Sequence, residues 1–380
     1  MQKKAFPHEL LEKSKEERFA YFKEYITEHP ILDDVLAKLM RAINLPKSGQ
    51  IIFVFGPTGV GKTTLIQSFS KKLIEKYLDE MERDNAFIPL ISVEAPMPTV
   101  GNFNWADLFS DILEQLNEVS KDLQFFRGSK NVVDEERKKF FKRFGYSRYS
   151  KLRFTVEKSL EARKSKVITI DEAQHLAVLA SARKLLDQPN TVKSIANRTE
   201  TAHILFGNYD LLLLNNLNGQ LSRRTEDIHF SRYAYEEEDI KSFKNIVWTF
   251  QNHLPTQQTP NLLGAWEYLY ERSLGCVGIL KEWLDRAFKL MLDDDDEELT
   301  VRHLEATALS ESKCITIVNE IIAAEEKLSK TFEGEDSLKG ILLKDKKDKA
   351  LSKKKNTRKG TQVGVRKPRR DQIGDTENEK

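Results

Sequence analysis

An eight-residue segment near the start of the chain has the residue types of a phosphate-binding loop. It reads Gly56-Pro57-Thr58-Gly59-Val60-Gly61-Lys62-Thr63, and Thr64 follows it. The glycines let the chain wrap closely around an anion, so that consecutive backbone N–H groups and the next helix N-terminus point toward phosphate oxygens. We predict that residues 56–64 bind ATP, that Lys62 neutralises the β and γ phosphates, and that Thr63 offers its hydroxyl to Mg²⁺.

The context of this loop also suits phosphate binding. An apolar run from Gln50 to Phe55 precedes it, as expected for a strand buried on both faces of a parallel sheet. Apolar residues at helical spacing follow it: Leu65, Ile66, Phe69 and Leu73. We therefore interpret the segment as a strand, loop and helix rather than as a glycine-rich turn.

A second pair of charged residues follows the apolar run Val167 to Ile170. Asp171 and Glu172 would stand at the carboxyl edge of a sheet, where open α/β sheets bind ligands. We predict that Asp171 holds hydrated Mg²⁺ and that Glu172 orients and polarises the attacking water. His175 comes just after this pair, and we expect it to pack or hydrogen-bond at a helix start rather than to act in catalysis.

Two further segments could complete a hydrolytic site. The apolar run His203 to Phe206 ends in Gly207-Asn208, and Asn208 either hydrogen-bonds the γ-phosphate or the attacking water, or is a plain turn residue. Arg223 and Arg224 lie farther along the chain. In a ring or filament of subunits, one of them could reach the γ-phosphate on a neighbouring subunit as an arginine finger.

The hydrophobic pattern predicts an α/β sandwich around a mostly parallel sheet. Apolar strands at 50–55, 87–93, 166–170 and 203–206 alternate with helical patterns, the first of them at 31–43. After residue 235 only helical stripes occur, and the fourth, at 301–330, breaks near 309–312. We expect an N-terminal helical extension at 1–30, an α/β domain at 31–234, a helical domain at 235–332 and a disordered basic tail at 333–380.

Charge is strongly segregated, although the chain of 380 residues has a formal net charge of only +2. Residues 339–370 carry a net charge of +12, and residues 127–166 carry +9 with aromatic side chains interleaved. A basic segment in an otherwise acidic body suits contacts with DNA phosphates. The candidate DNA contacts are Lys130, Lys139, Arg143, Arg148 and Lys151; the alternative is an ordinary charged helix at 135–144.

Composition also argues against two other classes of protein. No apolar run approaches the roughly 18 to 20 residues of a membrane span, so we expect a cytoplasmic protein with no membrane partner. Cys276 and Cys314 are too few for a disulfide framework, and we expect them to be reduced thiols.

Taken in order, these motifs resemble the AAA+ ATPases, over roughly residues 30–310. The run is GPTGVGKT, then ITIDEAQH, then a strand ending in Gly-Asn, then Arg223-Arg224, then helices. The segments DEAQH, ILFGNYDL and LSRR are similar to the TnsC/TniB group of transposition regulators, found in Tn-seven-like and CRISPR-associated transposons, and to ExeA-type relatives. This resemblance implies an AAA+ P-loop NTPase αβα sandwich followed by a helical lid.

The resemblance also implies a biological setting. Proteins of that group are expected to oligomerise on double-stranded DNA as ATP-dependent rings or helical filaments, to contact a TniQ-like target selector and to recruit a transposase, with hydrolysis driving disassembly. A prokaryotic, nucleoid-associated location follows. One departure concerns Gly278, which stands where many AAA+ lids place an arginine in a Gly-x-x-Arg motif. Either Lys281 substitutes from one turn later, or the lid does not read the γ-phosphate directly.

Three alternatives belong to other functional classes. An origin-recognition-like initiator would carry a winged helix, and residues 299–327 are short and helical for one. An ExeA-like assembly ATPase would work at the cell envelope, and the basic tail fits that setting less well. A non-hydrolysing switch would not need the Asp171-Glu172 pair.

Overall fold

The structure is a computed structural model that describes residues 5–44, 49–98, 103–118, 147–177, 187–215 and 225–333. Five predicted site residues lie outside these ranges, as does the expected tail beyond residue 333: Lys130, Lys139, Arg143, Arg223 and Arg224. Residues up to Ile321 form one compact unit, and those from Ile322 onward belong to a second. The sheet and the candidate site lie in the first unit.

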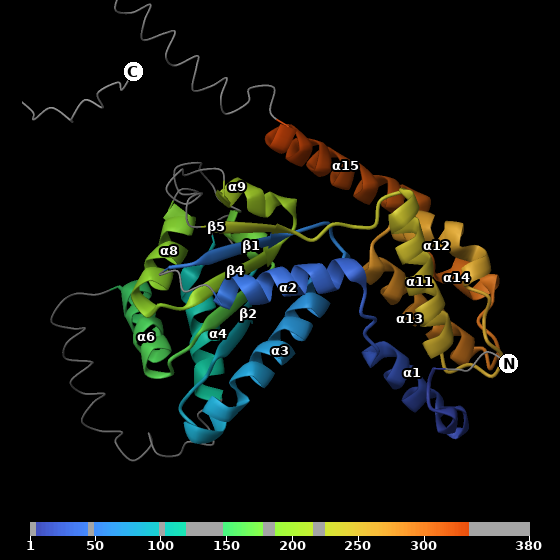
Figure 1. The fold of residues 1–380 in the computed structure, drawn as a ribbon, viewed down its shortest axis with the longest axis horizontal. Coiled ribbons are helices and arrows are strands. Elements are labelled where there is room, and N and C mark those ends of the chain that lie inside the picture. The colour runs from blue at the N-terminus through green and yellow to red at the C-terminus, as the bar shows by residue number, and fades with distance from the viewer. Residues whose placement is uncertain are drawn as a thin grey trace, which may run out of the picture. The chain divides into compact units, whose positions relative to one another are not determined.

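A five-stranded sheet forms the centre of the α/β region, and every strand pair in it is parallel (Figure 1). In chain order, the strands are β1 (Ile51–Phe55), β2 (Leu90–Glu94), β3 (Val167–Asp171), β4 (Ala202–Gly207) and β5 (Thr225–His229). Their spatial order is β2-β3-β4-β1-β5. The predicted parallel α/β fold is confirmed, and the tips of β1, β4 and β3 are brought side by side.

Two details of the sheet differ from the sequence-based prediction. The pattern did not predict β5, because its sequence Thr-Glu-Asp-Ile-His contains one aliphatic residue, Ile228, and only β1 pairs with it. Strand β2 begins at Leu90 rather than Phe87. Pro89 lacks the N–H of a ladder residue, so pairing starts after it.

Alternate strand residues face two different helix layers. Ile52, Val54, Ile204 and Phe206 pack with α2 (Pro30–Asn44) and α3 (Lys62–Arg83). The opposite face, which includes Ile168, Ile170 and His203, meets α4 (Trp105–Glu118), α6 (Arg148–Ala162) and α8 (Asp187–Thr199). The result is the predicted three-layer sandwich, with the strand tips left open for a ligand.

Acid pH should destabilise this sheet through His203. The side chain is 3% exposed, its Nδ1–H donates to the Thr201 carbonyl at 3.0 Å, and burial lowers its pKa to about 4. Because the unfolded chain takes up a proton first, near pH 6.5, stability present above that pH is lost as the pH falls toward 4. We expect the free energy of unfolding to drop by about 2 kcal/mol for His203 between pH 7 and pH 5.

Urea unfolding at these two pH values measures the effect. The substitution His203→Gln should reduce the pH dependence of the free energy of unfolding. The remaining dependence between pH 7 and pH 5 includes a contribution from His29, because burial lowers the pKa of that ring to about 4 as well. An unchanged pH slope in the His203→Gln variant would show that the buried ring is not the source.

The chain after β5 is helical wherever it is described, as predicted. The helices are α11 (Glu237–His253), α12 (Trp266–Ser273), α13 (Val277–Asp293), α14 (Val301–Thr307) and α15 (Glu311–Glu333). The break between α14 and α15 falls where the sequence pattern predicted it. The core shared by α11 to α14 includes Trp283, whose indole N–H donates to the Leu304 carbonyl at 2.9 Å. We call α11 to α14 the helical lid.

The N-terminal segment is part of the core of this lid. Helix α1 (Lys15–Glu24) starts at a capping box between Ser14 and Glu17. Phe22 is fully buried and packs edge-on against Phe250 and Phe288 of the lid. Arg18 donates two hydrogen bonds to the Pro255 carbonyl, at 2.6 and 3.0 Å.

Two further observations concern the described helices and the cysteines. Within the described ranges, each helix is too short or too polar to cross a membrane. Cys276 and Cys314 are free and buried.

Candidate functional site

The predicted phosphate loop joins the tip of β1 to the start of α3. Gly59 and Gly61 have φ angles of 74° and 112°, in the left-handed region that favours glycine, and Gly61 is the residue before α3. A Cβ on Gly56 would lie 2.1 Å from the Phe230 carbonyl oxygen, just after β5. The loop therefore needs these glycines for its turns and for its close contact with neighbouring backbone.

Lys62 lies across the loop that precedes it. Its Nζ donates to the carbonyl oxygens of Gly56 and Pro57, at 3.1 and 2.9 Å. Burial lowers the pKa of the Lys62 ammonium, and the nearby carboxylates of Glu172 and Asp171 partly offset this by favouring the charged form. A cation is thus held at the loop centre, where a triphosphate would place its negative charge.

Thr63 and Asp171 meet although they are 108 residues apart in the chain. The Thr63 hydroxyl donates to Asp171 Oδ2 at 3.2 Å, from the first turn of α3 to the end of β3. Burial raises the pKa of the Asp171 carboxyl, and a nearby divalent cation would favour its charged form. Mg²⁺ in proteins usually binds only one or two protein oxygen atoms, together with water and phosphate oxygens. A hydroxyl and a carboxylate are suitable oxygen ligands. The residues fit the predicted metal.

Glu172 adopts a left-handed backbone conformation, with a φ of 50°. Its N–H donates to Asp171 Oδ1 at 2.9 Å, and its Oε2 accepts a hydrogen bond from the side-chain amide of Gln174. The short helix η3 (Ala173–Ala177) follows, where His175 Nδ1 contacts the Ala95 carbonyl at 2.8 Å. The hydrogen-bonding role expected of His175 is confirmed, and the catalytic role of Glu172 stays a prediction.

Asn208 caps the short helix η4 (Tyr209–Leu211). Its Oδ1 accepts from the Asp210 N–H at 2.9 Å, and its Nδ2 donates to Asp210 Oδ2 at 3.2 Å. This geometry is that of the turn asparagine considered in the sequence analysis. Contact between Asn208 and the γ-phosphate stays a prediction.

The lid contacts the phosphate loop through its main chain. The Ile279 N–H, at the start of α13, donates to the Gly59 carbonyl at 2.9 Å. A Cβ on Gly278 would lie 2.4 Å from the Gly59 oxygen and 3.2 Å from the Gly61 nitrogen. The glycine that replaces the expected arginine therefore stands where no side chain fits.

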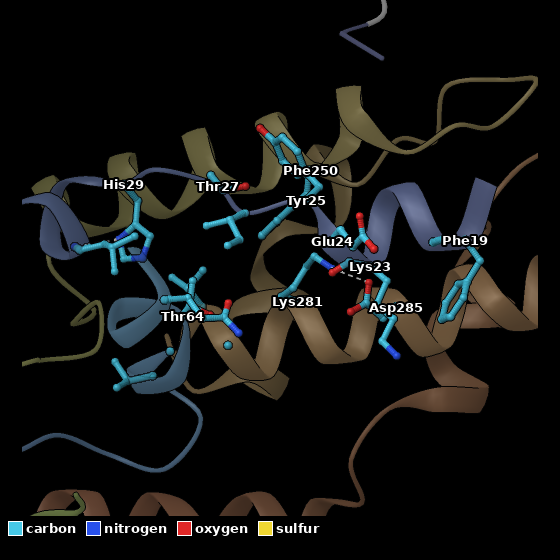
Figure 2. Close-up of a pocket in the computed structure, with 18 residues that line it drawn as sticks. Phe19, Lys23, Glu24, Tyr25, Thr27, His29, Thr64, Phe250, Lys281 and Asp285 are labelled. Carbon is cyan, nitrogen blue, oxygen red and sulfur yellow. Dashed lines mark hydrogen bonds and ion pairs between the residues drawn. The ribbon is translucent and has the colours of Figure 1, made fainter. Parts of the chain in front are cut away.

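Lys281 lies one turn farther along α13 and is engaged elsewhere. Its Nζ lies 2.5 Å from Asp285 Oδ1 and donates to the Lys23 carbonyl at 3.4 Å (Figure 2). It also sits over the Phe22 ring. Burial lowers the pKa of Lys281 and raises that of Asp285. These contacts tie α13 to the N-terminal segment rather than to the loop.

A cavity of about 650 Å³ opens beside the loop, between the N-terminal segment and the lid (Figure 2). Gly61 and Thr64 line one end, His29 and Tyr25 belong to its wall, and Val277 comes from α13. His29 Nδ1 contacts the Tyr233 hydroxyl at 2.9 Å, and burial lowers the pKa of this ring to about 4. Sequence patterns could not have found this cavity, because its wall comes from three distant segments.

Of the predicted DNA contacts, only Arg148 and Lys151 are described, and both lie in the first turn of α6. The Arg148 side chain is exposed. Several other basic residues of the predicted segment are paired within the domain. Arg153 lies 3.0 Å from Glu157, Lys158 2.6 Å from Glu161, and Lys164 2.8 Å from Asp84. Part of the predicted positive charge is therefore neutralised locally.

Comparisons with known proteins agree with this site. Residues 43–214 match the family described as "AAA domain". An uncharacterized ATP-binding protein of Pyrococcus horikoshii is 23% identical over 297 residues, which cover 73% of this chain and 88% of the relative.

The chain is also similar to solved structures, among them an ORC2 protein and a Walker-type ATPase. The Aeropyrum pernix ORC2 protein, in its ADPNP-ADP complexes, is 14% identical with a TM-score of 0.46, over 76% of this chain and 71% of that one. A Walker-type ATPase of Pyrococcus abyssi is 18% identical with a TM-score of 0.43, over 79% of this chain and 75% of that one.

The parallel sheet, the phosphate loop at the tip of β1 and the acidic pair after β3 define a P-loop nucleotide-binding protein. More narrowly, residues 43–214 match the AAA domain family, and the protein is an ATPase.

Proposed function

We propose that the protein binds ATP with Mg²⁺ at the β1–α3 loop and hydrolyses it between subunits of an assembly on double-stranded DNA. The contact between the Thr63 hydroxyl and Asp171 Oδ2 carries the nucleotide part of this proposal. It joins the two motifs that the sequence separates, which supports a metal site shared by Thr63 and Asp171. The adenosine would extend from Gly61 into the cavity of Figure 2, whose volume exceeds that of a purine nucleoside.

Each residue of the site has a separate role in ATP hydrolysis. Backbone N–H groups of the loop between Thr58 and Thr64 and the Lys62 ammonium hold the triphosphate. Thr63 and Asp171 would hold Mg²⁺, which would supply positive charge against the phosphate oxygens. The Glu172 carboxylate accepts a proton from the water that attacks the γ-phosphorus, while the bond to the β–γ bridging oxygen breaks and ADP leaves. Arg223 or Arg224 of a neighbouring copy would stabilise the transferring phosphoryl charge.

The finer biological assignment is regulation of DNA transposition. It is supported by the resemblance of the DEAQH, ILFGNYDL and LSRR segments to the TnsC/TniB group, and by the basic composition of residues 127–166. In this role the protein links a TniQ-like target selector to a transposase, and hydrolysis releases the assembly from DNA. The assembly would act at the nucleoid.

An origin-recognition-like initiator is the alternative that also predicts DNA binding. A winged helix contains a β-hairpin, and the described residues 230–333 contain helices and no strand. This observation favours the regulator over an initiator with its winged helix in that range.

Negative-stain imaging with duplex DNA tests the proposal, comparing ATP, a slowly hydrolysed analogue and ADP at low and moderate salt. We expect rings or filaments with ATP and dispersal with ADP. The substitution Arg148→Glu should weaken assembly, whereas Lys158→Ala should not, because Lys158 on the same helix is paired with Glu161. Binding to one specific sequence without assembly would favour the initiator, and indifference to DNA in every nucleotide state would overturn the DNA role.

A further inference from the structure

The side chain of Gln174 bridges the tips of two neighbouring strands. Its Nε2 donates to Glu172 Oε2, at the end of β3, and its Oε1 accepts from the Asn208 N–H at 3.3 Å, at the end of β4. This glutamine is part of the DEAQH segment, and its place in the sequence indicated no role for it. Its position two residues after Glu172, on the tight turn of η3, is what turns it back toward the acidic pair.

The two partners fix the orientation of the Gln174 amide. The Asn208 N–H can only donate, so it needs the amide oxygen, and a Glu172 carboxylate can only accept, so it needs the amide nitrogen. A reversed amide would face both partners with the wrong group. Gln174 therefore links the two strand tips with a single allowed orientation.

Gly207 makes room for this bridge. A Cβ at Gly207 would lie 2.5 Å from Gln174 Oε1 and 3.2 Å from the Gln174 backbone nitrogen. The Gly207 carbonyl also accepts from the Gly56 N–H at 3.3 Å, at the start of the phosphate loop. Hydrogen bonds thus run from the loop through the tip of β4 and Gln174 to the Glu172 carboxylate.

We infer that Gln174 is a positioning residue for ATP hydrolysis, which holds the Glu172 carboxylate in place and connects it to the tip of β4. This inference rests on the proposed role of Glu172. By occupying Oε2, the Gln174 amide presents Oε1 to the attacking water. Because the same amide is held by Asn208, a shift of the β4 tip moves Glu172 as well.

Steady-state hydrolysis by three variants tests this inference. Gln174→Ala removes both hydrogen bonds, and we expect kcat to fall about tenfold or more, because hydrogen bonds to charged groups are among the stronger ones. The KM and the affinity for a fluorescent ATP analogue should change less than about threefold, since Gln174 does not line the loop. Gln174→Glu keeps the side-chain shape and the acceptor for the Asn208 N–H, but it puts a second carboxylate next to Glu172. Its kcat should therefore fall at least as far as that of Gln174→Ala.

Gln115→Ala is the matched control, because the side-chain Oε1 of Gln115 accepts from the Ser92 N–H on β2 in a contact away from Glu172. It should keep the wild-type kcat. Full activity of Gln174→Glu would overturn the inference, since a glutamine that only fills space would tolerate this change. Equal losses of kcat and of nucleotide affinity in Gln174→Ala would also overturn it.

A double-mutant cycle with Glu172→Gln separates this inference from the proposed function. If Gln174 acts through Glu172, adding Gln174→Ala to Glu172→Gln should cause less than about a twofold further loss. Wild-type hydrolysis by Glu172→Gln alone would refute the role of Glu172 itself, and this inference with it. A large loss in Glu172→Gln together with an additive loss from Gln174→Ala would refute only the positioning role.

Discussion

The substitution Lys62→Ala should abolish ATP hydrolysis and weaken ATP binding by about a hundredfold or more. The ammonium lies across the loop within hydrogen-bond distance of the Gly56 and Pro57 carbonyls, and no other side chain of the loop from Gly56 to Thr64 is cationic. Removing it leaves the phosphate charge to backbone dipoles and the metal alone. Phosphate release and the fluorescence of a labelled ATP analogue measure the two effects.

Lys71→Ala is the control for this experiment, because Lys71 is an exposed lysine of the same helix α3. It should retain wild-type binding and turnover. A Lys62→Ala protein with an unchanged circular dichroism spectrum and more than half of the wild-type turnover would refute the assignment of the phosphate loop.

The substitution Gly278→Ala should weaken nucleotide binding about tenfold and lower the free energy of unfolding by about 1–3 kcal/mol, the usual cost of overpacking. The added methyl group would meet the Gly59 oxygen at 2.4 Å, so either α13 or the phosphate loop must move. Alanine is the better helix former by up to about 1 kcal/mol, so any loss occurs despite a favourable change in propensity. Gly278→Arg, which introduces the arginine of the Gly-x-x-Arg motif, should lower nucleotide binding and stability further.

Gly264→Ala is the matched control on the lid. A Cβ there meets only the side chain of Asn261, which can turn away, whereas Gly278 meets backbone. Urea unfolding and nucleotide titration of the two alanine variants make the comparison. If Gly278→Ala and Gly264→Ala behaved alike, direct contact between the lid and the loop would not matter for binding.

Much of the nucleotide site followed from local sequence. The loop from Gly56 to Thr63 is contiguous in sequence. When a strand precedes such a loop and a helix follows it, its glycines, lysine and threonine have the same roles in phosphate binding. The Asp171-Glu172 pair follows an apolar strand, and parallel strands bring their carboxyl ends to one edge. The helical pattern of the lid, including the break between α14 and α15, is equally local.

Other features depended on segments that are distant in the chain. Strand β5 has one aliphatic residue and becomes a strand only because β1 offers it an edge. Phe22 gave no sign that it would enter the lid core, because the helical pattern of α1 is weak and its partners lie more than 200 residues away. The charge count of residues 127–166 could not show which lysines and arginines already have acidic partners.

The sequence by itself determined the features that depend on consecutive residues: the phosphate loop, the acidic pair, and the order of the helices and of the four apolar strands. Only the tertiary structure decided why Gly278 is a glycine, where Lys281 points and what Gln174 touches. The physical reason is the same in each case. A steric contact or a side-chain hydrogen bond depends on the partner's position, and here each partner lies on an element that the chain reaches only by folding.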